Sequence, residues 1–164
     1  MKEILKGLIG EKIYCLYSDK IELNTSSEET KNIMVVHMTP YVLIRLTKKF
    51  TFGVKILAKQ IDDELFEIIA ERNSIEELKH NELNFSKHFI RPLEKILSIN
   101  VYYNKDSLEN PNLAPSLIEI CLKSSSLVLY PSYIPFGGVM TFLEPIESVK
   151  IDMLKDFKLI YSLK

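Results

Sequence analysis

The chain has 164 residues, of which 46% are hydrophobic and 26% are charged, and its formal net charge is -1 at pH 7. This composition is typical of a folded globular domain and unlike that of a disordered chain. A charge balance so close to zero gives no overall field that would hold a polyanion, so it argues against non-specific nucleic-acid binding.

The sequence shows no targeting or membrane segment. Charged residues interrupt the apolar positions of the first 13 residues. No stretch approaches the ~20 apolar residues that span a bilayer, so neither a signal peptide nor a membrane span is expected. Two cysteines, Cys15 and Cys121, lie far apart without a CxxC motif. This usage favours reduced thiols in a cytoplasmic protein and leaves one disulfide as the alternative.

The first third of the chain is expected to be rich in strands. A short charged helix at the N-terminus leads into a strand at Lys12–Tyr17. A loop of Ser, Asn and Glu follows at 18–32, and then two apolar strands that a turn around Pro40 would join into a hairpin. His37 lies on the polar face of the first of these strands, and Phe50–Ile61 is expected to be the next strand.

The segment 62–92 is the most helical part of the sequence. An amphipathic stripe with helical spacing runs into it, formed by Ile61, Leu65, Ile68 and Ile69. Ser74 and Glu77 have the spacing of a capping box, which predicts the start of a second helix.

Strands return in the last third of the chain. A strand is expected at Ser98–Tyr103, followed by a polar loop at 104–116 and a hairpin whose turn surrounds Ser125. In the first strand of that hairpin one face is apolar, with Ile118, Ile120 and Leu122, and the other face carries Glu119 and Cys121.

The two strand-rich parts resemble each other. Phe52 and Gly53 align with Phe136 and Gly137 at an offset of 84, and Lys12–Tyr17 aligns with Ser98–Tyr103 at an offset of 86. This alignment also matches the opening helix with 91–97. The alternative is that two strand-rich stretches align through shared composition.

These patterns predict one domain over 1–164, with an internal repeat of 5–61 and 93–146 joined by the helical connector 62–92. The expected fold class is α+β. It would be a predominantly antiparallel β-sheet built from two duplicated halves joined by a helical segment, because neither half alone would bury both sheet faces.

Carboxylates gather at the start of the connector. Asp63, Glu64, Glu67 and Glu71 belong to this group, and the last three would share one helical face. Such a row would attract a partner protein with a basic surface and accelerate its association. The alternative is a solvated outer face without a binding role.

A second candidate contact region is rich in aromatic residues. Tyr130, Tyr133 and Phe136 lie within "LYPSYIPFGG" together with prolines that restrict the backbone. Rigid aromatic side chains lose little entropy on binding, so this segment is a candidate contact loop. The alternative is a strand connection whose rings pack beneath it.

No motif for catalysis or for a cofactor is present. Cys15 and His37 are residue types that can act as nucleophile and base, but nothing in the sequence brings them together. His80 and His88 are too far apart in sequence for a metal-binding helix face. No enzymatic activity, cofactor or metal is therefore expected.

The chain resembles one functional group of proteins. A charged opening helix running into "LIGEKIYCLY", a Lys- and Ile-rich composition, alternating strands and an acidic segment together resemble the small bacterial immunity proteins, which neutralise a toxin from a competing or sibling cell. The resemblance implies a cytoplasmic inhibitor that binds its toxin and catalyses nothing. No functional residue carries over, because no motif is shared.

The leading hypothesis is thus a soluble protein-binding module that binds neither nucleic acid nor membrane; the sequence sets no oligomeric state. One alternative is a small-molecule-binding domain or small enzyme with a pocket between the halves, lined by Tyr133 and Phe136. Another is a self-associating structural subunit, which an exposed edge strand would favour.

Overall fold

The computed structural model describes residues 1–18, 22–24, 35–39, 41–46, 52–60, 66–74, 83–84, 93–104, 115–123, 126–132, 138–142 and 157–164. Within these ranges the chain forms one short helix and a series of antiparallel strands. The elements are α1 (Lys2–Lys6), β1 (Ile13–Ser18), β2 (Glu22–Asn24), β3 (Val35–Thr39), β4 (Tyr41–Leu46), β5 (Phe52–Gln60), β6 (Phe66–Ser74), β7 (Leu83–Asn84), β8 (Ser98–Asn104), β9 (Leu117–Cys121), β10 (Ser126–Ser132), β11 (Gly138–Phe142) and β12 (Phe157–Leu163).

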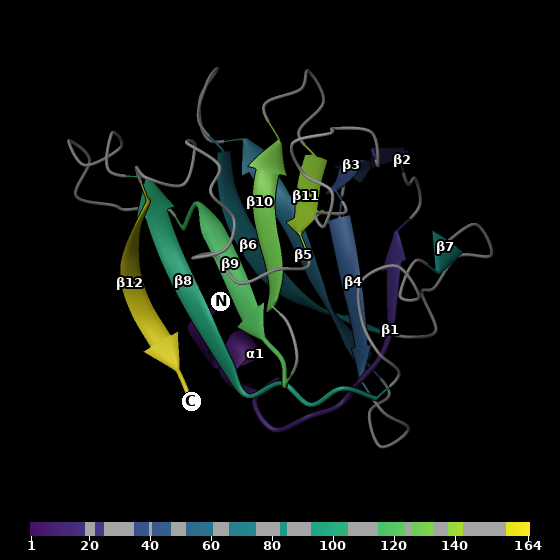
Figure 1. Ribbon diagram of the computed structural model, residues 1–164, viewed down its shortest axis with the longest axis vertical. Coiled ribbons are helices and arrows are strands. Elements are labelled where there is room, and N and C mark those ends of the chain that lie inside the picture. Colours follow the sequence, from purple (N-terminus) through teal and green to yellow (C-terminus); the bar gives the residue numbers. More distant parts are fainter. Residues whose placement is uncertain are drawn as a thin grey trace.

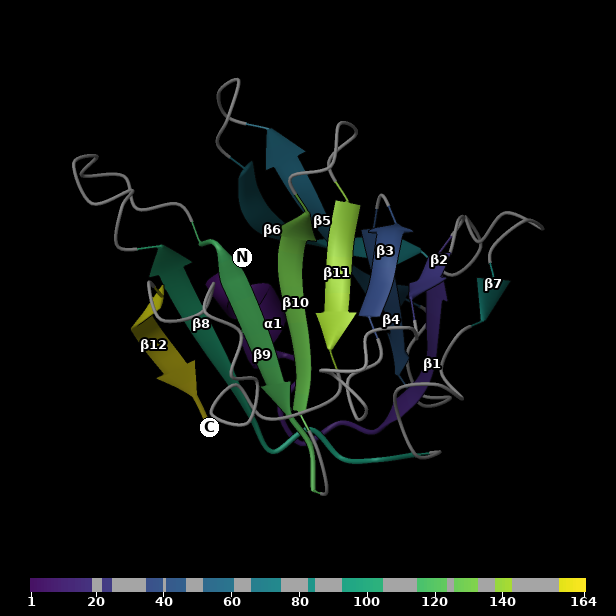
Figure 2. The same cartoon turned by 45° about the horizontal axis from the view of Figure 1, so that its top comes forward.

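The strands form two sheets that lie one behind the other (Figure 1). One sheet has five strands in the order β6-β5-β4-β1-β7, and the other has seven in the order β12-β8-β9-β10-β11-β3-β2. Figure 2 shows α1 between the two layers, behind β8 and β9. The expectation of a predominantly antiparallel sheet is confirmed, with one short helix among the described residues.

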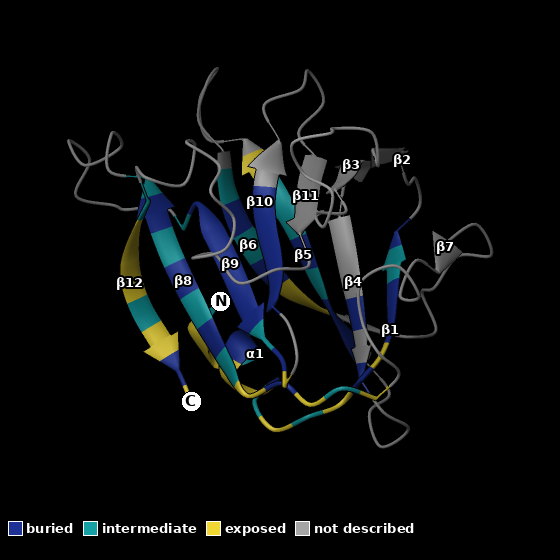
Figure 3. Cartoon of the chain, in the orientation of Figure 1, coloured by how far each residue is buried: buried dark blue, intermediate teal, exposed yellow. Residues whose placement is uncertain are grey.

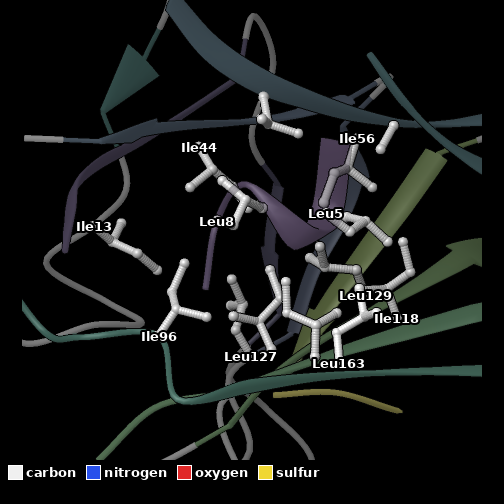
Figure 4. Packing of buried hydrophobic residues seen from close by; sticks show 14 of the residues in the cluster. Leu5, Leu8, Ile13, Ile44, Ile56, Ile96, Ile118, Leu127, Leu129 and Leu163 are labelled. Atoms are coloured by element: carbon white, nitrogen blue, oxygen red, sulfur yellow. The ribbon is translucent and has the colours of Figure 1, made fainter. Parts of the chain in front are cut away.

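Among the described residues, one hydrophobic cluster fills the space between the sheets. Ile44 and Ile56 contribute to it from the five-stranded sheet, and Ile118 and Leu129 from the seven-stranded sheet (Figure 4). Leu8 follows α1 and packs into the same cluster. The alternation of apolar residues along each strand places these side chains inward, so burial on one face of each sheet holds the layers together.

The predicted helix over Ile61–Ile69 is wrong where the structure describes it. Phe66–Ser74 forms strand β6, which pairs with β5 along its whole length. Ile68 and Ala70 are buried in the core, whereas Glu67 and Ile69 are only half-buried on the opposite face. A period of two therefore outweighs the helical spacing, because β5 supplies a complete ladder of backbone hydrogen bonds.

The predicted hairpin around Pro40 is also wrong. Strand β3, which precedes Pro40, pairs with β2 and β11 of the seven-stranded sheet, whereas β4, which follows it, pairs with β1 and β5 of the other sheet. The chain therefore passes from one sheet to the other at this point. A proline restricts its own backbone and that of the preceding residue, so it suits a break between strands.

Other local predictions are confirmed. The opening helix is α1, the strands expected at Lys12–Tyr17 and Ser98–Tyr103 are β1 and β8, and β9 and β10 form the hairpin expected around Ser125. The helix matched to α1 at 91–97 is wrong for Leu93–Leu97, where Leu93 is in a turn and the following residues form a non-helical connection that pairs at Lys95. The helical connector is also wrong at Leu83–Asn84, which form strand β7, and its residues other than β6 and β7 lie outside the described residues. The internal repeat itself stays a prediction.

Candidate protein-contact surface

The two sheets are joined at one end by an antiparallel pairing of segments distant in sequence. Lys12 pairs with Lys95 in an isolated bridge. The amide of Ile13 donates to the carbonyl of Glu94 at 3.0 Å, and the amide of Ile96 donates to the carbonyl of Glu11 at 2.9 Å. Figure 1 shows both segments running along the lower end of the molecule. We call this pairing of 11–13 with 94–96 the seam.

The two sides of the seam differ in burial. Ile13 and Ile96 are fully buried and pack into the core (Figure 4), whereas Lys12 and Lys95 are exposed. Paired residues in an antiparallel ladder lie on the same face, and the hydrogen bonds on either side make Lys12 and Lys95 a non-hydrogen-bonded pair. In such a pair the Cα atoms are only about 4.5 Å apart, so the lysine side chains are direct neighbours.

A β-bulge places Tyr14 beside this lysine pair. In the pairing of β1 with β4, Ile13 faces Leu46 and Cys15 faces Arg45, so Tyr14 is the extra residue. Its side chain is 46% exposed, whereas Ile13 and Cys15 on either side are buried. Bulges redirect side chains and are common next to functional sites, and here the bulge turns an aromatic ring outward.

Leu93 directly precedes the segment 94–96 of the seam. Its φ is +62°, the only positive φ among the described residues other than glycine. Its side chain is 46% exposed. A branched side chain in this left-handed region is strained, and such strain is typically retained only where the surrounding structure or a function requires it.

The apolar side chains exposed to solvent concentrate here. Five large hydrophobic residues are exposed within the described ranges. Three of them directly flank the seam segments in sequence: Tyr14, Leu93 and Leu97. Figure 3 shows exposed and half-buried residues along this lower edge of the molecule. We define the seam surface as Lys12, Tyr14, Leu93, Lys95 and Leu97. Clustered apolar side chains ringed by polar ones are typical of protein interaction sites.

The remaining exposed hydrophobic residues are Leu159 and Ile160 of β12. This strand is one of the two edge strands of the seven-stranded sheet, and its pairing with β8 shifts register between Leu159 and Tyr161. A bulge of this kind is one of the devices that discourage pairing of an open edge with another chain.

A buried carboxylate lies on the opposite face of the seven-stranded sheet from the core. Glu119 is 2% exposed, and its Oε2 accepts hydrogen bonds from Asn100 Nδ2 at 2.8 Å and from the hydroxyl of Tyr102 at 3.0 Å. Asn100 Nδ2 also lies 3.7 Å from Cys121 Sγ, a weak donor–acceptor contact. The prediction that Glu119 and Cys121 face away from the core is confirmed. Such hydrogen bonds compensate the burial of a charge, so they explain why the carboxylate of Glu119 can be buried.

Two of the predicted acidic site residues lie on β6. Glu71 is exposed and Glu67 half-buried, on the outer face of the five-stranded sheet. In the ladder with β5, Glu67 is directly opposite Lys59 and Glu71 is directly opposite Lys55. Each of these carboxylates is therefore opposite a lysine on the neighbouring strand, and the expected helical row of carboxylates is not formed. Asp63 and Glu64 lie outside the described residues.

The predicted aromatic contact loop is only partly described. Tyr130 is buried, and its ring contacts that of Phe157 edge to face, with centroids 5.6 Å apart and an interplanar angle of 80°. Tyr130 is therefore a packing residue in this structure, whereas Tyr133 and Phe136 lie outside the described residues.

The candidate nucleophile and base are in different sheets. Cys15 belongs to the five-stranded sheet and His37 to the seven-stranded sheet, where it is opposite Glu22. Cys15 and Cys121 are both free thiols. His80 and His88 lie outside the described residues. In the described part of the chain, no three His, Cys, Asp or Glu side chains are grouped to hold a metal ion.

Comparison with known proteins adds no relative. No protein-family model, curated protein or solved structure matches the chain. Within the described ranges, no helix has the length and apolar character of a membrane span. The function is therefore inferred from the geometry of the chain and from the resemblance noted in its sequence.

Proposed function

We propose that this chain is a protein-binding module and that it binds its partner through the seam surface. The observation that carries this proposal is the exposure of Tyr14, Leu93 and Leu97, which lie within two residues of the paired Lys12 and Lys95 in sequence. The resemblance to small bacterial immunity proteins supplies the class of partner, which is a toxin that the chain neutralises by contact.

The local backbone conformation supports a binding role for the seam surface. A bulge exposes Tyr14 and a left-handed conformation positions Leu93, although both residues would gain free energy from burial. The seam itself is anchored in the core, since its residues Ile13 and Ile96 are fully buried. A rigid surface loses little conformational entropy when it binds. Aromatic residues such as Tyr14 are enriched among the residues that dominate binding energy.

The proposal is tested by crosslinking from within the surface. A photoreactive amino acid at Leu97 should capture one protein in the source cell, and mass spectrometry should identify it as a toxin domain. A variant with the same amino acid at Leu159, which is similarly exposed on β12, is the matched control and should not capture that protein.

Affinity for the captured protein then tests the surface by titration calorimetry. Leu93→Asp together with Leu97→Asp should weaken binding by at least about tenfold, because a charge is placed where apolar contact is needed. Leu159→Asp should leave the affinity unchanged. Equal capture at both positions, or equal loss of affinity in both variants, would count against the seam surface as the binding site.

A further inference from the structure

We infer that the exposed pair Lys12–Lys95 is a receptor for carboxylates, so that the partner protein presents an acidic and apolar segment to the seam surface. This inference rests on the proposed function and specifies the chemistry of the partner. It differs from the expectation of a basic partner, which was based on the carboxylates of the connector.

Like charges are paired unfavourably at the seam. Lys12 and Lys95 are direct neighbours across a non-hydrogen-bonded position, where like charges destabilise the pair. Neither lysine forms an ion pair with another described residue. A carboxylate placed between the two ammonium groups would relieve their repulsion and receive hydrogen bonds from both.

The neighbouring acids lie on the other side of the seam. Glu11 and Glu94 precede the two lysines in sequence, but they are the residues whose carbonyls accept the backbone hydrogen bonds of the seam, and both are less exposed than the lysines. Alternation along an extended segment turns them to the other side of the seam from Lys12 and Lys95. The exposed side thus carries positive charge.

The exposed leucines around Lys95 favour a protein segment as the occupant. Leu93 and Leu97 lie two residues before and after Lys95, so the positive charge is bracketed by exposed leucines. Phosphates of a nucleic acid would satisfy the lysines but leave the leucines exposed, whereas a segment with acidic and apolar side chains satisfies both. The overall charge of -1 also gives nucleic acid no general attraction.

The acidic residues that motivated the earlier expectation are differently placed. Glu67 and Glu71 each face a lysine across β5 and β6. Opposite charges in direct register reduce the net field of that face, so a basic partner gains little from it. The seam surface, in contrast, presents two lysines without an opposing acid in register.

The test uses nuclear magnetic resonance on the isotopically labelled full chain. The probe is a synthetic peptide of alternating Leu and Glu, compared with a peptide of alternating Leu and Lys, inorganic phosphate and single-stranded DNA. The Leu/Glu peptide should give saturable shifts at the amides of 10–14 and 93–97, and added salt should weaken this binding.

Charge-reversal variants separate the lysine pair from general attraction. Lys12→Glu with Lys95→Glu should weaken binding of the Leu/Glu peptide by about tenfold or more and create binding of the Leu/Lys peptide. Lys158→Glu is the matched control, since Lys158 is exposed on β12, and it should change the affinity far less. If the double variant folds poorly, Lys12→Gln with Lys95→Gln provides the same comparison without added acids.

Other outcomes would overturn either the inference or the proposed function. Shifts elsewhere in the chain, equal binding of both peptides, or saturation of the seam by phosphate or DNA alone would exclude a receptor for acidic protein segments. If the captured partner binds the Lys12→Glu, Lys95→Glu variant with unchanged affinity, the inference is rejected and the proposed function still stands. Peptide binding at the seam without any capture from Leu97 would reject the proposed function instead.

Discussion

At the scale of single residues, Leu93 and Leu97 form a natural comparison. Both belong to the seam surface and are similarly exposed, at 46% and 50%, but only Leu93 has a positive φ. A leucine in the left-handed region costs roughly 1 kcal/mol or more relative to glycine. The two positions therefore differ mainly in backbone strain.

Substitution by glycine should therefore affect the backbone contribution to stability in opposite directions at the two positions. Leu93→Gly relieves strain, whereas Leu97→Gly only adds flexibility, which costs about 0.5–1 kcal/mol. Because each variant loses a comparable half-exposed side chain, we expect Leu93→Gly to be the more stable by about 1–2 kcal/mol. Urea denaturation of both variants measures the difference. Equal free energies of unfolding would show that Leu93 is not strained.

The seam surface was not predicted from the sequence, and its residues show why. Leu93, Lys95 and Leu97 alternate with Glu94 and Ile96, which is a strand signal, but the alignment of 91–97 with the opening helix assigned them to a helix. The partner segment lies some 80 residues earlier in sequence, as Lys12 and Lys95 show. Local patterns carry no information about such a pairing.

At the scale of elements, strands with one buried face were predictable and their partners were not. Alternation identified β8 and the core face of β9, because a period of two survives wherever one side meets the core. The segment of β6 satisfied helical spacing and strand alternation at once, and only its pairing with β5 decides between them. The exchange of sheets between β3 and β4 depends likewise on β11, which lies far along the chain.

The contact of α1 with β12 joins the two ends of the described chain. Lys2 Nζ lies 5.1 Å from the centroid of the Tyr161 ring, a cation–π contact. The hydroxyl of Tyr161 is buried and has no hydrogen-bond partner among the described residues. Burial raises the pKa of Tyr161 above its ordinary value of 10.0, since the phenolate is penalised more than the phenol.

Tyr161→Phe should therefore change the alkaline stability of the protein. Because the pKa is higher in the folded state, its contribution to stability is fully present below pH 10.0 and is lost as the pH rises through the folded-state value. We expect the variant to be equal or up to about 1 kcal/mol more stable at pH 8, where it removes an unpaired hydroxyl. Above pH 10 it should lose less stability than the parent chain.

Urea denaturation at a series of pH values from 8 to 11 measures both effects. Lys2→Ala serves as the control, because it removes the cation–π contact and keeps the hydroxyl that titrates. Parallel pH curves for Tyr161→Phe and the parent chain would show that burial of this hydroxyl does not persist in solution.

At the scale of the whole molecule, several connections tie the sheets into one body. Within the described residues these are the passage from β3 to β4, the seam, and a hydrogen bond of 2.7 Å from the amide of Ile68 to the carbonyl of Pro115. The core cluster draws on both sheets and on α1. The prediction that neither sequence half alone would bury both sheet faces stays a prediction.

Leu8 offers a test of this cooperation. It is fully buried and packs between the sheets without belonging to either. Leu8→Ala should lower the free energy of unfolding by about 2–5 kcal/mol, because it removes apolar contacts and leaves a cavity. If the molecule unfolds as one unit, hydrogen exchange measured by mass spectrometry should accelerate equally in β1 and β4 and in β8 and β9.

Leu159→Ala is the control for this experiment, because Leu159 is 51% exposed at the edge strand β12. Its effect should stay within about 1 kcal/mol and be confined to the exchange of β12 and β8, since little buried surface is lost. Loss of protection in only one sheet after Leu8→Ala would mean that the two sheets unfold separately. A rigid seam between them would then be untenable, because the pairing of Lys12 with Lys95 requires both layers to stay in place.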